Sequence, residues 1–63
     1  MKVKDVITAI KKDGWIYRNT TGDHHHYKKH GERHIITVPG KPSDEVSPGV
    51  LAAIRRTTGL PLR

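Results

Sequence analysis

Three consecutive histidines at residues 24–26 are the residues of this chain best suited to acid-base chemistry. Apolar residues stand on both sides of them, so the run belongs to the folded chain and is not an expression tag. An imidazole has an ordinary pKa of about 6.5 and can therefore give or take a proton near neutral pH. Lys28 and Lys29 follow closely, and lysine ammonium groups attract phosphates. This segment thus combines proton carriers with cations.

The spacing within this segment divides its side chains between two faces of a strand, because side chains alternate along extended backbone. One face would carry His24, His26 and Lys28, and the opposite face His25, Tyr27 and Lys29. Tyr27 is the natural core residue, so we expect His25 to be packed or partly buried beside it. His24 and His26 would then lie on the open, basic face of the sheet.

Cleavage of RNA is a reaction that these residue types can catalyse. When the 2′-hydroxyl of RNA attacks the adjacent phosphate, a base must take its proton and an acid must protonate the leaving oxygen. Cations must also stabilise the negative charge that develops. One positioned acid or base typically contributes a rate factor of about 10² to 10⁴. A single histidine on a basic sheet would therefore give a modest ribonuclease without a metal ion.

A metal-binding interpretation of the same histidines is weaker. His24 and His26 could hold Zn²⁺ or Ni²⁺, but two ligands do not complete a structural zinc site, and no third ligand stands at a defined spacing. A peptide that stores or senses metal ions would take up zinc stoichiometrically and change its fold on binding. We therefore expect neither a metal ion nor another cofactor.

The elements that position these residues must come from a short chain. With 63 residues, of which 33% are hydrophobic, we expect one small domain over residues 1–63, with too small a core to enclose a deep metabolite pocket. The absence of cysteine excludes disulfides and thiolate zinc sites. We see neither a signal peptide nor an apolar run of roughly 18 residues, which favours the cytoplasm over a membrane or a secreted location.

The charge balance points to acidic partners. Twelve lysines and arginines stand against six acidic residues, for a formal net charge of +6 at pH 7. A basic surface raises the local concentration of nucleic acid and speeds encounter. It is also found on proteins that bind acidic proteins or ribosomes. Charge alone therefore leaves both nucleic acid and an acidic protein open as partners.

Two helices are predicted, one near each end of the chain. The first spans residues 3–13 and can be stopped by Gly14 in a left-handed conformation. The second has Ser47 as its N-cap and Pro48 at its first position, and ends at Gly59. Apolar residues recur at helical spacing in both, as Val3, Val6, Ile7 and Ile10 in the first and Val50, Leu51 and Ile54 in the second.

Three strands are predicted between the helices, at residues 15–17, 24–29 and 34–38. Turns are expected at residues 19–23 and 30–33, and a loop at residues 39–47. Sequential strands suggest an antiparallel meander. The chain is therefore predicted to have an α+β fold in the order α-β-β-β-α, with two helices on one face of a three-stranded sheet and the other face bare.

Four short motifs, taken together, resemble those of a known family. They are Gly14 with Trp15, residues 22–27, Val38 with Pro39, and residues 47–54. In this order they resemble the HicA family of bacterial toxins over nearly the whole sequence. HicA proteins are small mRNA-cleaving members of type II toxin–antitoxin systems, and their fold is similar to the double-stranded RNA-binding domain. The resemblance therefore implies a single HicA-like domain that acts as an mRNA endoribonuclease.

The resemblance also implies which residues carry the chemistry. In the family a glycine, a serine and the catalytic histidine open the second strand, and Gly22, Asp23 and His24 stand there in this chain. His24 is thereby implied as the catalytic residue, with Gly22 shaping the turn before it. Asp23 replaces the serine and could orient the imidazole or stabilise its protonated form. A HicB-like antitoxin is the implied protein partner, and it would neutralise the toxin by covering its active face.

Two hypotheses for the function follow. The first is a metal-independent endoribonuclease, in which His24 acts as general base or acid and His26, Lys28 and Lys29 bind the RNA. The second is a non-catalytic RNA-binding module, or a degenerate toxin, that binds RNA and an acidic partner without cleavage. A basic module can bind double-stranded RNA by shape, through its phosphates and 2′-hydroxyls. Salt-sensitive binding of RNA that stays intact would favour the second hypothesis.

Overall fold

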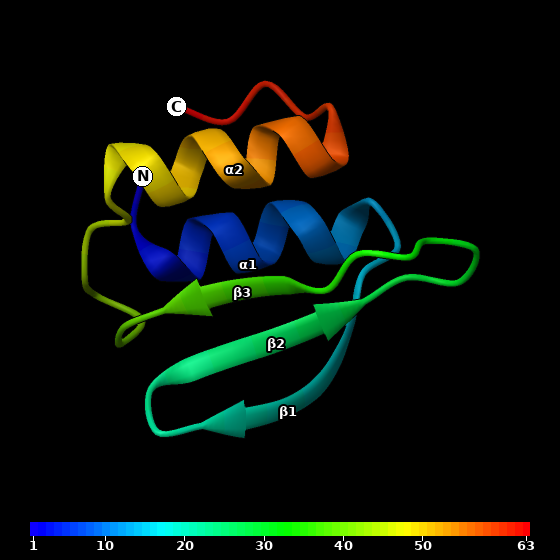
Figure 1. Cartoon of the computed structure of the whole chain (residues 1–63). Coiled ribbons are helices and arrows are strands. Elements are labelled where there is room, and N and C mark those ends of the chain that lie inside the picture. The colour runs from blue at the N-terminus through cyan, green and yellow to red at the C-terminus, as the bar shows by residue number, and fades with distance from the viewer.

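The computed structural model describes residues 1–63 as a three-stranded antiparallel sheet accompanied by two helices (Figure 1). The elements in chain order are α1 (Val3–Lys12), β1 (Ile16–Thr21), β2 (His24–Lys28), β3 (Ile36–Pro39) and α2 (Pro48–Thr58). The strands lie in the order β1-β2-β3, as expected for a meander. The predicted α+β class and the order α-β-β-β-α are therefore confirmed.

Helix α1 forms where the predicted apolar stripe lies. Val3, Val6 and Ile10 are fully buried on one side of it. The loop that follows β3 returns to the start of this helix, where the Val3 N–H donates to the Asp44 carbonyl at 2.8 Å. That bond satisfies one of the amides that the first turn of a helix leaves without an internal partner. The loop over residues 39–47 thus ties α1 to the sheet.

Helix α2 has the predicted caps at both ends. The Ser47 hydroxyl accepts a hydrogen bond from the Val50 N–H at 3.3 Å, and Pro48 occupies the first turn. Gly59 takes the left-handed conformation, with φ of 74°, that ends many helices. Leu51 is buried, but Val50, which we expected in the buried stripe, is only partly buried and borders the surface.

The strand boundaries differ most from the predicted ones at the end of β1 and at the start of β3, and elsewhere by at most one residue. β1 continues to Thr21, which pairs with His24, so the expected turn over residues 19–23 contracts to Gly22 and Asp23. Gly22 has a φ of 61° while Asp23 does not have a positive φ, a combination that suits a two-residue type II′ hairpin turn. β3 begins at Ile36 rather than at residue 34, because the pairing with β2 starts with Tyr27 and Ile36.

The core lies between the helices and β3. Both helices make their main contacts with the sheet at β3, and neither lies over β1 in Figure 1. All six residues of β1 are exposed, including Ile16 and Tyr17. The helices therefore cover the sheet at β3, whereas β1 lies in open solvent. Neither helix has the length and apolar character needed to cross a membrane.

Candidate functional site

The strand register sends the three histidines of β2 to different surroundings. Facing residues in the ladder with β3 are His24 with Pro39, His25 with Val38, His26 with Thr37 and Tyr27 with Ile36. Directly opposite residues share a sheet face. Tyr27 and Val38 are core residues, so His25 lies on the covered face. His24 and His26 lie on the open face, as the alternation predicts.

His25 is held by hydrogen bonds at both ring nitrogens. Its Nε2 lies 2.9 Å from the Gly40 carbonyl, which can only accept, so Nε2 donates. In the neutral ring, Nδ1 then accepts from the Thr20 hydroxyl at 3.2 Å. The Tyr17 hydroxyl contacts the same Thr20 oxygen at 2.8 Å. His25 therefore connects β1 to the end of β3 and has no nitrogen free for a substrate.

His24 is the exposed histidine of the strand. Its side chain is 55% exposed, and its Nδ1 lies 3.3 Å from the Asp23 carboxylate. This carboxylate favours a proton on Nδ1, which leaves the lone pair on Nε2. Nε2 has no hydrogen-bond partner in the protein. His24 thus has an oriented ring with one free nitrogen at the surface, the arrangement that a general base requires.

His26 and Lys28 continue the open face away from His24. The Nδ1 of His26 lies 3.0 Å from the Thr37 hydroxyl, which faces it across the ladder. Lys28 is exposed at the end of β2. Successive residues on one face of a strand are roughly 6.6 Å apart. His24, His26 and Lys28 therefore form a row of titratable and cationic groups along the open face.

Lys29 does not lie in the row that His24, His26 and Lys28 form on the open face. It follows the end of β2, and its Nζ contacts the Asp13 carboxylate at 3.3 Å. Asp13 also accepts from the Trp15 indole at 3.3 Å. The side chain of Lys29 runs close to Gly14, where its Cε would lie 3.3 Å from an added Cβ. In the structure, Lys29 connects the end of α1 to the sheet.

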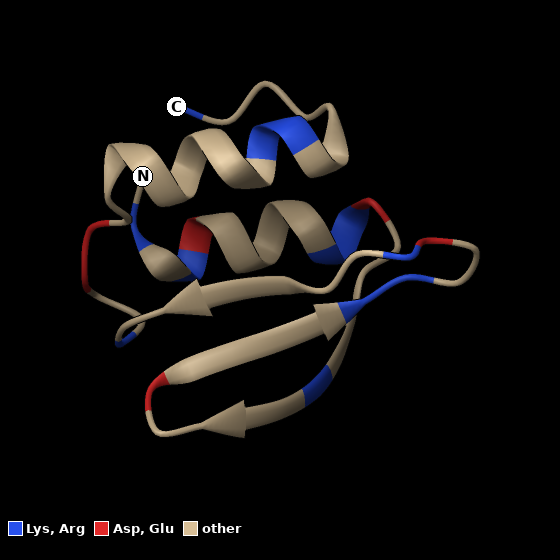
Figure 2. Ribbon diagram, in the orientation of Figure 1, with Lys and Arg blue, Asp and Glu red and all other residues tan.

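Charge is unevenly distributed around this face (Figure 2). Lysine and arginine appear on β1, at the end of β2 and in the loop towards β3, while the β1–β2 turn is acidic. The exposed residues concerned are Arg18, Lys28 and Arg33, with Asp23 in the turn. A polyanion would therefore be attracted most strongly to the Lys28 end of β2. His24 lies at the opposite end of the same strand.

Tyr27 holds the strand against the core below this face. It is 4% exposed, and its ring meets that of Tyr17 edge to face, with centroids 5.8 Å apart. Burial, and to a smaller extent the neighbouring Tyr17, raises the pKa of Tyr27 above its ordinary value of 10.0. The phenol therefore stays neutral beyond the pH at which an exposed tyrosine ionises.

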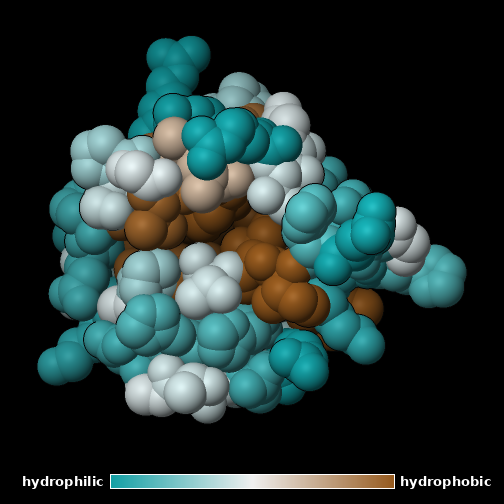
Figure 3. All heavy atoms as spheres, viewed as in Figure 1, coloured by the Kyte–Doolittle hydropathy of each residue, from teal (hydrophilic) through white to brown (hydrophobic).

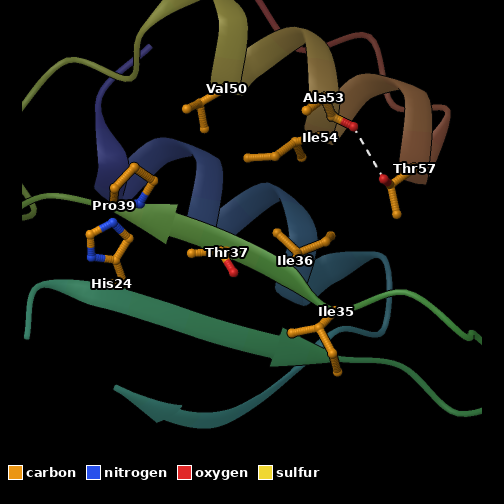
Figure 4. Close-up of a pocket in the computed structure, with 9 residues that line it drawn as sticks. All are labelled: His24, Ile35, Ile36, Thr37, Pro39, Val50, Ala53, Ile54 and Thr57. Atoms are coloured by element: carbon orange, nitrogen blue, oxygen red, sulfur yellow. Dashed lines mark hydrogen bonds between the residues drawn. The ribbon is translucent and has the colours of Figure 1, made fainter. Parts of the chain in front are cut away.

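A groove beside His24 is the part of the site that the sequence did not indicate. It lies between β3 and α2, and His24 stands with Pro39 at one end of it (Figure 4). On α2 it is lined by Val50, Ala53, Ile54 and Thr57. The only signal in the sequence is their helical spacing at i, i+3, i+4 and i+7. That pattern does not tell a groove wall from a core stripe.

No three histidine, aspartate or glutamate side chains converge as a metal ion would require. The fold and this surface together define a small, basic α+β protein whose sheet presents an exposed histidine.

A model of the family described as HicA toxin of bacterial toxin-antitoxin matches residues 3–60. The chain therefore belongs to the HicA toxin family, and the family resemblance seen in the sequence is confirmed. Membership makes the chain a toxin of a toxin–antitoxin system, which has an antitoxin partner. No curated protein matches the chain.

Proposed function

We propose that this toxin is a metal-independent endoribonuclease that cleaves mRNA, with His24 as its proton-transfer residue. The observation that carries the proposal is the difference between two adjacent side chains. Both ring nitrogens of His25 are bonded within the sheet, whereas His24 is half-exposed and has Nε2 free. Membership of a toxin family adds support, because a toxin needs a target, and the net charge of +6 suits a nucleic acid.

The reaction needs only one residue in direct contact with the nucleophile. His24 Nε2 takes the proton of a 2′-hydroxyl, the 2′-oxygen forms a bond to phosphorus, and the bond between phosphorus and the 5′-oxygen breaks. The departing oxygen takes a proton from water, and the hydroxide that remains takes the proton back from His24. The products are a 2′,3′-cyclic phosphate and a 5′-hydroxyl. Asp23 acts on the other nitrogen, where its carboxylate keeps the ring oriented, as in other His–Asp pairs.

His26 and Lys28 are proposed to bind the phosphates that flank the cleaved one. They extend the same strand face, and both lie beyond His24 in the direction of the basic end of β2. Lys29 can contribute its positive charge to RNA binding only from the other side of the strand, beside Asp13. Gly22 contributes by allowing the tight turn that begins the strand at His24.

The proposal is tested by cleavage of a single-stranded transcript in EDTA. We expect the wild type to cut the RNA and His24→Ala to lose about 10² to 10⁴ in rate, the usual worth of one positioned acid or base. His34→Ala is the matched control, because His34 is also exposed but lies in the loop before β3. Its rate should equal that of the wild type.

Two results would overturn the proposal. Undiminished cleavage by His24→Ala would remove this histidine from the mechanism. If the wild type leaves the transcript intact while binding it in a salt-sensitive manner, the chain is a non-catalytic RNA-binding module.

The antitoxin is proposed to be a HicB-like protein that covers the open face of the sheet. Such a partner would be acidic, to match a basic toxin. It would also contact β1 on that face, where Ile16 pairs with Lys28 and is 62% exposed. Exposed apolar side chains beside a charged face are typical of a protein interface.

A further inference from the structure

The groove between β3 and α2 is an apolar depression bordered by hydrophilic side chains. Figure 3 shows it as a band of hydrophobic atoms between the helix and the sheet. It holds about 360 Å³ of open space and is lined by nine residues, five of them hydrophobic. Ile35, at one end of it, is 44% exposed. This volume lies within the roughly 300 to 1,000 Å³ of small-ligand pockets.

The packing of α2 keeps the groove open. Leu51 and Ile54 are buried and fix the helix against the core. Ala53, one residue before Ile54, is exposed and has only a methyl group, so it leaves the space in front of β3 unfilled. Figure 4 shows Ala53 and Thr57 on α2 and Thr37 on β3, on opposite sides of the groove. The small side chain of Ala53 therefore leaves room for the depression.

Polar groups at the sheet edge accompany the apolar walls. The Gly40 N–H donates to the Asp23 carbonyl at 2.9 Å, and hydrogen-bonded pairs alternate along an antiparallel ladder. By this alternation the N–H and C=O of Thr37 point away from β2, on the side where α2 lies. The Thr57 hydroxyl donates to the Ala53 carbonyl at 3.1 Å and keeps lone pairs for another donor.

We propose that this groove is a subsite for one unpaired nucleobase of the RNA strand, next to the phosphate that is cleaved at His24. The inference rests on the proposed function, because His24 is both its proton-transfer residue and part of the groove wall. A base has two apolar faces and a polar edge, which match apolar walls that carry a few hydrogen-bonding groups. A nucleotide whose phosphate lies at His24 would have its base within reach of this space.

The favoured RNA is therefore single-stranded at the cleavage site. Proteins that read RNA sequence mostly bind splayed-out bases of single strands, since the bases of a duplex are stacked and paired. The groove would accept one such base and so influence where the toxin cuts. Thr37 and Thr57 are the groups placed to read its edge.

An extended peptide is the other kind of occupant that a groove between a strand and a helix can take. Two features of β3 disfavour it here. The strand has only four residues, and one of them is Pro39, which has no N–H to donate to an added strand. A ladder with a partner strand would therefore be short and incomplete.

The experiment measures binding of ten-nucleotide 2′-O-methyl RNAs, which cannot be cleaved because the nucleophile is blocked. Fluorescence anisotropy in EDTA compares the wild type with Ala53→Phe, which fills the groove, and with Thr57→Leu, which narrows it from a second position. Thr8→Phe adds the same ring at an exposed position of α1 outside the groove and serves as the control. Circular dichroism and thermal unfolding show whether each variant is folded.

We expect Ala53→Phe to weaken binding of the single strand by about 5- to 100-fold, or about 1 to 3 kcal/mol of binding free energy, because the added ring takes the space of the base. Thr57→Leu should act in the same direction, and Thr8→Phe should bind like the wild type. A decamer with abasic sugars should bind all four proteins equally weakly, and a duplex of the same sequence should not distinguish them.

Equal binding of the single strand by the wild type and folded Ala53→Phe would overturn the subsite. If Ala53→Phe instead abolishes only binding of a HicB-like antitoxin, the groove belongs to a protein partner, and the nucleobase assignment is wrong. Either result leaves the cleavage test of His24→Ala unaffected. A wild type that binds the single strand through the groove but leaves a cleavable transcript intact would refute the nuclease while sparing the subsite.

Discussion

The three adjacent histidines of β2 differ in their availability to a substrate because each has different surroundings. His25 bonds to Thr20 and to the Gly40 carbonyl, and His26 bonds to the Thr37 hydroxyl. His24 contacts only the carboxylate of the residue before it. The chemistry of an imidazole is the same in all three. The hydrogen-bond partners exclude His25, and the greater exposure of His24 distinguishes it from the half-buried His26.

The stability of alanine variants should follow this difference. His25→Ala removes two hydrogen bonds in a partly buried position, so we expect the free energy of unfolding to fall by about 1 to 3 kcal/mol. His24→Ala removes an exposed side chain and should stay within about 0.5 kcal/mol of the wild type. Urea unfolding monitored by the fluorescence of the single, buried Trp15 gives both values. Equal losses for the two variants would contradict the assignment.

At the scale of the elements, the sequence allowed most of the fold to be predicted. Helix caps are local signals, and both ends of α2 were predicted from Ser47, Pro48 and Gly59. The extent of β1 was not, because Asn19 favours turns in isolation and pairs with His26 only when the strands meet. The ladder also contains an irregularity between Tyr17 and Asn19, which no local pattern reveals.

The site was predictable to a similar degree. Alternation along β2 separated His24 from His25 because a strand has a fixed period of two. The groove escaped prediction because it depends on how α2 packs beside β3, which is set by tertiary contacts and not by a local pattern. The bond between Lys29 and Asp13 joins residues 16 positions apart, and it escaped prediction for the same reason.

The burial of Tyr27, on β2, predicts that the protein loses stability at high pH. The pKa of Tyr27 is raised above 10.0, chiefly by burial, so the folded protein keeps the phenolic proton where the unfolded chain releases it. The stabilising contribution is therefore complete below pH 10 and is lost as the pH rises through the folded-state pKa. Urea midpoints measured from pH 9 upward should fall less steeply for Tyr27→Phe than for the wild type.

The matched control for this pH series is Tyr17→Phe, because Tyr17 is exposed and its phenol makes only the smaller contribution to the shift. Its midpoints should fall nearly as steeply as those of the wild type. If Tyr27→Phe declines as steeply as the wild type, other groups such as the lysines cause the alkaline instability.

The molecule as a whole is too small to separate its functions in space. Only 11 of 63 residues are buried, and they form one core cluster against β3. Everything that contacts a partner must share the remaining surface. A substrate and an antitoxin would then compete for the open sheet face, which also carries the exposed histidine.

This competition can be measured directly. Adding a HicB-like antitoxin should displace a labelled 2′-O-methyl RNA from the toxin and suppress cleavage at a stoichiometric amount. Raising the salt from 50 to 200 mM should weaken RNA binding, by an extent that grows with the number of phosphate contacts. An unrelated acidic protein of similar size is the control and should displace little. A stable ternary complex of RNA, toxin and antitoxin would show that the antitoxin covers another face.

The two-residue turn at Gly22 and Asp23 has a consequence for how this chain can change over time. Suppose that one residue is inserted there while the two-residue turn and the pairing of β1 with β2 are kept. β2 would then shift by one position, and each of its side chains would move to the opposite face of the sheet. His25 would then meet solvent, and its neighbours would be driven inward. The length of this hairpin connection therefore determines which histidine the strand exposes.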